Sequence, residues 1–169
     1  MTRWFNVQLL LLPLLLATFV FGFSTNSHAD SGDKLIVVVG DTQKEALKGW
    51  INFLKESEFP VKEITTAEFD AYKKSPYIVL NGVPGDAQNN GPVLKKILTD
   101  QELKKVSESG NREYFIKDDV FTKGQTIVVF AGTPYSSAEG IRKNTQSDWL
   151  IMMSGWFDIE LSPQAMYGY

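Results

Sequence analysis

Apolar runs and amphipathic stretches alternate along the chain from residue 34 onward. The first run, residues 35–40, is continuously apolar and ends in glycine, which is typical of a strand buried on both faces of a sheet. The stretch that follows, up to about Phe59, has apolar residues on one broad face and mostly lysines on the other. This spacing predicts an amphipathic helix, and Pro60 ends it because proline cannot continue a helical ladder.

The same alternation continues over most of the remaining chain. Further strands are predicted at residues 61–65, 77–80, 113–119 and 125–131, and further helices at residues 67–74, 93–98, 101–109 and 137–153, the last interrupted near residue 145. A Thr-Lys-Gly turn at residues 122–124 predicts a hairpin between the last two strands. No regular pattern follows residue 155, and we interpret residues 161–169 as a C-terminal tail.

Four matches to the capping-box pattern fall where a helix is expected to begin. They are Thr42 with Glu45, Thr65 with Glu68, Thr99 with Glu102, and Ser136 with Glu139. The element order is then β-α-β-α-β-α-β-β-α, and alternating strands and helices imply parallel pairing with helices on both faces. The sequence predicts an α/β fold, a three-layer sandwich whose mostly parallel sheet has four to five strands and ends in a β-hairpin.

The first 29 residues have the pattern of an export signal. Arg3 supplies the positive start, residues 9–23 are an apolar stretch of 15 residues, and Ser27-His28-Ala29 fits a cleavage site. An uncleaved membrane anchor is the alternative, but a spanning helix needs about 20 apolar residues. We therefore expect a signal peptide at residues 1–29 and a single α/β domain at residues 30–160. The chain would be exported to the periplasm or cell surface, without a membrane span after cleavage.

The composition of the remaining chain excludes several kinds of chemistry. Without residues 1–29 it keeps 16 of the 17 basic residues and all 20 acidic ones, and it has neither histidine nor cysteine. Histidine triads, cysteine nucleophiles and ordinary zinc sites are therefore excluded, and the core must suffice without disulfides. The acidic balance argues against a nucleic-acid partner. We predict no catalytic residue, no metal and no cofactor; an enzyme would have to use carboxylates, lysine, tyrosine or serine.

The strand ends hold the candidate ligand-binding residues. In open α/β sheets, ligands bind beyond the carboxyl ends of the strands, where free helix amides can hold an anion. The candidates at these ends are Asp41, Thr42, Asn81, Gly82, Gly132, Thr133 and Ser136. The alternative is structural, because glycine and capping residues occur at strand-to-helix turns in general. In the elbow after the last strand, Ser136 would then cap the helix and Glu139 would complete the box.

Three other groups of residues have both a functional and a structural interpretation. Asp118 and Asp119 are adjacent, so a strand would point them to opposite faces, and we interpret them as edge or turn residues. The loop at residues 81–92 could offer oxygens to calcium, but calcium sites use several carboxylates and this loop has a single aspartate. Among the late aromatic residues, Trp149 suits a core helix, whereas Tyr167 and Tyr169 suit surface contacts.

Two segments carry a family resemblance. Residues 77–98 (YIVLNGVPGDAQNNGPVLKKIL) and 112–144 (REYFIKDDVFTKGQTIVVFAGTPYSSAEGIRKN) resemble the α/β module of surface-layer (S-layer) proteins. Lys123-Gly124 and Ala131-Gly132 match the pattern of that module, while residues 81–84 (Asn-Gly-Val-Pro) depart from its Gly-Gly-Pro form. The chain is similar also to the non-catalytic α/β domain that precedes the barrel in family 20 and family 67 glycosidases. Both resemblances imply a scaffold or interface role and supply no catalytic residue.

These observations lead to three functional hypotheses of different classes. The first is an exported, non-enzymatic domain with a structural or binding role at the cell envelope, with an envelope component or a second copy as partner. The second is a carbohydrate- or anion-binding periplasmic module that uses the strand ends. The third is a carboxylate-dependent hydrolase.

Overall fold

The computed structural model describes residues 34–108, 110–144 and 148–167. The signal peptide expected at residues 1–29 lies outside the described residues, as does Tyr169. None of the helices in these three described ranges has the length and apolar character needed to span a bilayer.

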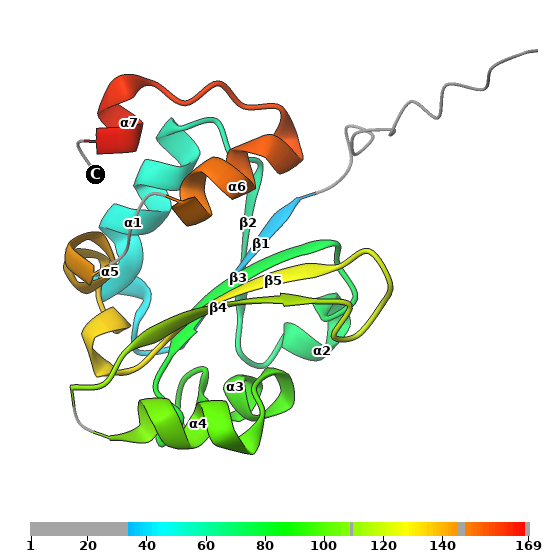
Figure 1. The fold of residues 1–169 in the computed structure, drawn as a ribbon, viewed down its shortest axis with the longest axis vertical. Coiled ribbons are helices and arrows are strands. Elements are labelled where there is room, and N and C mark those ends of the chain that lie inside the picture. The colour runs from blue at the N-terminus through cyan, green and yellow to red at the C-terminus, as the bar shows by residue number, and fades with distance from the viewer. Residues whose placement is uncertain (1–33, 109, 145–147, 168–169) are drawn as a thin grey trace, which may run out of the picture.

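One sheet of five strands forms the centre of the domain (Figure 1). The strands are β1 (Leu35–Val39), β2 (Val61–Thr65), β3 (Tyr77–Gly82), β4 (Glu113–Asp118) and β5 (Thr126–Ala131), in the order β2-β1-β3-β5-β4. The pairs β1–β2, β1–β3 and β3–β5 are parallel, and β4 joins β5 as an antiparallel edge strand. The predicted α/β class, parallel pairing and final hairpin are therefore confirmed.

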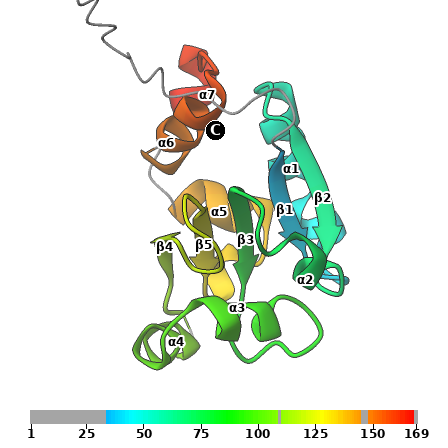
Figure 2. The same ribbon diagram turned by 90° about the vertical axis from the view of Figure 1, so that its right-hand side faces the viewer.

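Helices cover both faces of the sheet, which gives the expected three layers (Figures 1 and 2). On one face lie α1 (Lys44–Glu56), α5 (Ala138–Asn144) and α6 (Asp148–Phe157). On the other lie α2 (Phe69–Tyr72), α3 (Gly91–Ile97) and α4 (Asp100–Ser107). Strand β1 is buried over its whole length, as its continuous apolar run predicts for a central strand.

Aromatic rings fill the core between the sheet and α1, α5 and α6. Phe130 of β5 packs edge-on against Trp50 of α1 and Trp149 of α6, with ring centroids 5.9 and 5.2 Å apart. All three side chains are fully or almost fully buried. Such a core stabilises the domain without a disulfide, since each buried aromatic side chain removes a large apolar area from water.

The C-terminal region is helical, which differs from the irregular tail expected after residue 155. Helix α6 continues to Phe157, and a further helix, α7 (Pro163–Tyr167), follows. The Trp156 ring stacks on Tyr77 at the start of β3, with centroids 4.8 Å apart. Residues 156–165 are therefore part of the packed domain. Helix α6 escaped detection beyond residue 155 because it is apolar around most of its circumference and shows no clear helical period.

One of the four expected capping boxes forms, and the other three do not. Thr99 and Glu102 make the complete box at the start of α4. Glu68 accepts from the Thr65 amide and hydroxyl, but α2 begins at Phe69 with Glu68 as its N-cap residue and no side-chain cap, so the box expected from Thr65 is wrong. Helix α1 begins at Lys44 with Gln43 as its N-cap residue, so the expected pair of Thr42 and Glu45 is wrong.

The helix after the last strand also begins differently from expectation. Helix α5 starts one residue later than the Ser136 pattern requires, at Ala138. The hydroxyl of Ser137 accepts from the Gly140 amide, and its carbonyl accepts from the Ile141 amide. Ser137 is therefore the capping residue in place of Ser136, and Glu139 pairs with Lys143 along the helix.

Candidate functional site

The carboxyl ends of β1 and β3 mark the point where a ligand binds in other open α/β sheets. The chain passes from β1 to β2 on one side and continues with β3 on the other side of β1. Adjacent strands whose connections diverge in this way form a topological switch point, and ligands bind just beyond it. Four of the seven strand-end residues predicted from the sequence lie around this position.

Asn90 bridges the two strand ends at the switch point. Its side-chain amide donates to the Val38 carbonyl of β1 and to the Asn81 carbonyl of β3, each at 2.9 Å. Its side-chain oxygen accepts from the Thr66 hydroxyl at 2.7 Å. Asn90 is fully buried, so both amide protons and the oxygen are used within the protein.

Asn89 holds the turn after β1 in a similar way. Its side-chain oxygen accepts from the Thr42 amide at 3.0 Å, and the Thr42 hydroxyl lies 2.8 Å from its nitrogen. The same nitrogen donates to Asp86 at 2.6 Å. Asn89 packs so closely on Gly40 that a Cβ atom at position 40 would overlap it. The chain thus places two asparagines of its own where a ligand would otherwise lie.

The end of β5 is hydrogen-bonded to the neighbouring end of β3. The Gly132 amide donates to the Gly82 carbonyl at 2.8 Å, and the Asn81 side chain donates to the Tyr135 carbonyl at 2.8 Å. Gly132 has φ of 117° and lies against the backbone of Asn111, so a side chain at position 132 meets both strain and overlap. These contacts make the elbow after β5 a packed structural turn.

The structure therefore separates the seven candidate residues. Thr42, Asn81, Gly82 and Gly132 lie together around the two asparagines. Thr133 is exposed and Ser136 is half-buried in a short 3₁₀ turn, where the Thr133 carbonyl accepts from the Ser136 amide. Asp41 lies apart from this group and lines a pocket on the β2 side of β1.

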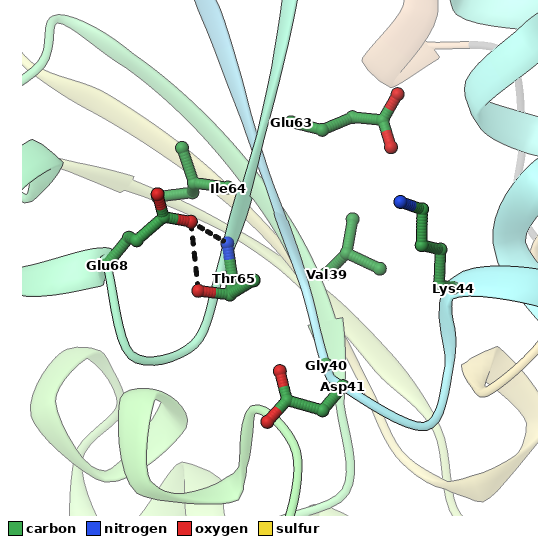
Figure 3. Close-up of a pocket in the computed structure, with 8 residues that line it drawn as sticks. All are labelled: Val39, Gly40, Asp41, Lys44, Glu63, Ile64, Thr65 and Glu68. Atoms are coloured by element: carbon green, nitrogen blue, oxygen red, sulfur yellow. Dashed lines mark hydrogen bonds between the residues drawn. The ribbon is translucent and has the colours of Figure 1, made fainter.

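This pocket encloses about 210 Å³ beyond the ends of β1 and β2 (Figure 3). Its lining comprises Val39, Gly40, Asp41, Lys44, Glu63, Ile64, Thr65 and Glu68. The three carboxylates outnumber the single lysine, which makes the pocket unsuited to an anion. No aromatic ring belongs to this lining, so it offers no platform on which a sugar could stack.

Two of the three carboxylates already have partners within the protein. Glu63 forms an ion pair with Lys55 of α1. Glu68 accepts from the amide and hydroxyl of Thr65 at 2.8 and 2.9 Å, and these bonds, the backbone one first, lower the pKa of its carboxyl. Asp41 and Lys44 are exposed at the mouth. In Figure 3 the Lys44 amino group points toward the Glu63 carboxylate, whereas Asp41 points to the other side.

The adjacent carboxylates of Asp118 and Asp119 make hydrogen bonds that stabilise the hairpin between β4 and β5. Asp119 takes a left-handed conformation with φ of 56°, and it accepts from the Gly124 amide within the hairpin turn. Asp118, which closes β4, accepts from the Thr126 hydroxyl. Both are turn and edge residues, as the sequence indicated. Within the described ranges, no group of three or more aspartate or glutamate side chains is arranged to hold a metal ion.

Sequence reasoning missed the residues that decide the geometry of the switch point. Asn89 and Asn90 were considered only as calcium ligands, yet their oxygens accept from Thr42 and Thr66. Their contacts with Thr42, Thr66 and Val38 link residues 24 to 52 positions apart, and no local pattern indicates these three contacts. An available signal was the Asn-Asn pair in a glycine-rich loop that precedes a helix, because asparagine readily bonds to nearby backbone groups.

Comparison with known proteins found no family model, no curated protein and no solved structure that matches this chain.

Proposed function

We propose that the chain is an exported, non-enzymatic α/β domain with a structural or binding role at the cell envelope, similar to the S-layer modules it resembles. One observation carries the proposal. The switch point, where α/β proteins hold cofactors and substrates, contains the fully hydrogen-bonded Asn90 and its neighbour Asn89. Function is then exerted through the outer surface of the domain.

The experiment is co-sedimentation of the purified protein with isolated envelopes and with wall polysaccharide. The matched variant is Asp41→Asn with Lys44→Met, which alters the mouth of the pocket and leaves the asparagine contacts in place. We expect both proteins to pellet with envelopes to the same extent. A wild-type protein that stays in the supernatant with every envelope fraction would overturn the proposal.

A second candidate function rests on the pocket between the ends of β1 and β2. Its excess of carboxylates favours a small cationic or hydroxyl-rich ligand over the anion considered from the sequence. Binding predicts a melting temperature that rises with ligand concentration, tested with polyamines and with mono- and disaccharides. If the melting temperature of Asp41→Asn rises as much as that of the wild type, the pocket is not the binding site. If the variant with Asp41→Asn and Lys44→Met alone loses envelope binding, this second function is favoured.

A further inference from the structure

The outer edge of β4 is open in the described part of the chain. Strand β4 is the last strand of the sheet, and Figure 2 shows no described element beside its outer edge. None of its six residues is buried, whereas five of the six residues of β5 are. An edge strand of this kind presents unpaired backbone N–H and C=O groups to which another strand can add.

Apolar side chains flank this edge on both faces of the sheet. On the α4 side, Phe115 lines a groove of about 680 Å³ together with Gln101 and Lys105 of α4 and with Glu108, which follows this helix. On the α6 side, Ile116 is 44% exposed and Ile151 of α6 is 54% exposed. They are the two large hydrophobic residues that are exposed within the described ranges.

The two isoleucines lie on the same face of the sheet, because Tyr114 and Ile116 of β4 both face the layer that contains α6. The Tyr114 hydroxyl of β4 donates to Asp148 at the start of α6 at 2.8 Å. Strand β4 and α6 run in the same direction from this bond. Trp156, near the end of α6, stacks on Tyr77 at the start of β3. Tyr77 is level with Thr126 of β5, and Thr126 pairs with Asp118 at the end of β4. Ile116 follows two residues after Tyr114 on the same face of the strand, and Ile151 follows three residues after Asp148 on the same side of the helix.

We propose that the β4 edge binds the β4 edge of a second copy of this chain, antiparallel, with Phe115 opposite Phe115 of the partner. The charges in this register are self-complementary. Arg112 faces the partner's Asp118, and Glu113 faces the partner's Lys117. Tyr114 faces the partner's Ile116, so an aromatic and a β-branched side chain meet on the α6 face.

The neighbouring registers that keep the same faces together lack this match. A shift that sets Ile116 opposite itself brings Glu113 against Asp119 and Tyr114 against Asp118. A shift the other way sets Tyr114 opposite itself and leaves Arg112 opposite Ile116. Only the register centred on Phe115 pairs every charge of β4 and of Arg112 with an opposite charge.

The intramolecular ion pairs extend this pattern across the proposed contact. Glu113 is paired with Lys105 of α4, and Lys117 is paired with Glu102 at 2.8 Å. In the dimer, these pairs join into a row of alternating charges across both copies. The contact is isologous and closed, as two-fold dimers require, and gives one sheet of ten strands. The inference goes beyond the envelope role and does not depend on it.

The test is disulfide cross-linking of the full chain, as purified, in two single-cysteine variants. The chain has no cysteine, so any disulfide of Phe115→Cys must join two copies. In the proposed register, the two Cα atoms at position 115 lie about 5 Å apart, which a disulfide can bridge. The two Cα atoms at position 116 lie farther apart than the roughly 7 Å that a disulfide can bridge. Mild oxidation is expected to convert Phe115→Cys into a covalent dimer at least tenfold faster than Ile116→Cys.

A second arm does not depend on the folding of the Phe115 variant. Arg112→Glu and Asp118→Arg each create like-charge pairs across the contact, and the double variant restores opposite charges. Sedimentation equilibrium is expected to give a dimer dissociation constant at least tenfold weaker in each single variant and near the wild-type value in the double variant. A wild-type chain that stays monomeric, faster cross-linking of Ile116→Cys, or no recovery in the double variant would overturn the inference. A monomeric chain could still pellet with envelopes, so this outcome and failure of the envelope proposal are distinguishable.

Discussion

The side-chain oxygen of Asn89 accepts the backbone N–H of Thr42 at 3.0 Å, across 47 positions of sequence. This bond uses an amide that would be free to hold an anion after β1, and it joins the loop before α3 to the loop before α1. Together with Asn90, it fills the space between the carboxyl ends of β1 and β3 with buried side chains.

Asn90→Ala is expected to destabilise the domain by about 2–4 kcal/mol, because it leaves the Val38 and Asn81 carbonyls without their buried donor. Urea denaturation measures the loss as a lower midpoint with an unchanged slope. Gln88→Ala, an exposed position in the same loop, is the matched control and should change the stability by less than about 0.5 kcal/mol. Equal effects of the two variants would mean that Asn90 does not bridge the strands.

Gly132→Ala should destabilise the domain by at least about 2 kcal/mol, since φ is 117° and the new Cβ would overlap the Asn111 backbone. Gly155→Ala is the counterpart in helix α6, where nothing lies within 4 Å of the new Cβ. There, alanine should be neutral or stabilising by up to about 1 kcal/mol. Thermal melting compares the two variants, and a neutral Gly132→Ala would contradict the elbow geometry.

Glu102 should contribute to stability at neutral pH and not in acid. Partial burial raises the pKa of its carboxyl, but hydrogen bonds from Lys117 and Thr99 outweigh this effect and lower the pKa below 4.5. Because the folded-state pKa is lower than the unfolded one, the contribution is present above about pH 4.5 and is lost as pH falls through the folded value. Glu102→Gln should therefore cost about 1 kcal/mol at pH 7 and little at pH 3.

The measurement for Glu102 is chemical denaturation of wild type and variant at several pH values between 3 and 7. Glu160→Gln is the control, because it removes an exposed carboxylate on the α1 side of the sheet. A Glu102→Gln deficit that is the same at pH 3 and pH 7 would show that the carboxylate charge does not matter.

Trp156→Ala is expected to destabilise the domain by about 2–3 kcal/mol, because the half-buried ring stacks on Tyr77 and packs against the core. Ile151→Ala removes an exposed side chain from the same helix and should cost less than about 1 kcal/mol in the monomer. Denaturation at low protein concentration gives both values. If Trp156→Ala leaves the free energy of unfolding unchanged, this segment is a tail that does not pack on the domain.

The sequence was sufficient to predict the sheet and most of its strands. Strand β2 was predicted within its observed limits, and the hydrophobic runs of β1 and β5 identified the central strands, because burial on both faces leaves a continuous apolar signature. The start of α4 was equally clear, since both halves of its capping box are local. The cap expected at Thr42 failed where the distant Asn89 side chain binds Thr42, and the one expected at Ser136 failed because the neighbouring Ser137 caps α5 instead.

The candidate site could be predicted only in part. The strand ends follow from the alternation of elements, and four of the seven candidates do lie together. Which side chains fill the space between them depends on a loop whose contacts with Val38, Thr42 and Thr66 are long-range. The pocket beside Asp41 escaped prediction for the same reason, because Glu63 comes from the neighbouring strand β2 and Glu68 from the turn that follows it.

Hydrogen exchange of the Asn90 side-chain amide, followed by NMR, tests the central claim most directly. Both of its protons are donated to buried carbonyls, so we expect them to exchange only on the timescale of global unfolding. Their rates should not change when anions, sugars or polyamines are added. Exchange at the rate of a free side-chain amide, or a shift of these protons on adding a small molecule, would show that the strand ends form an open binding site.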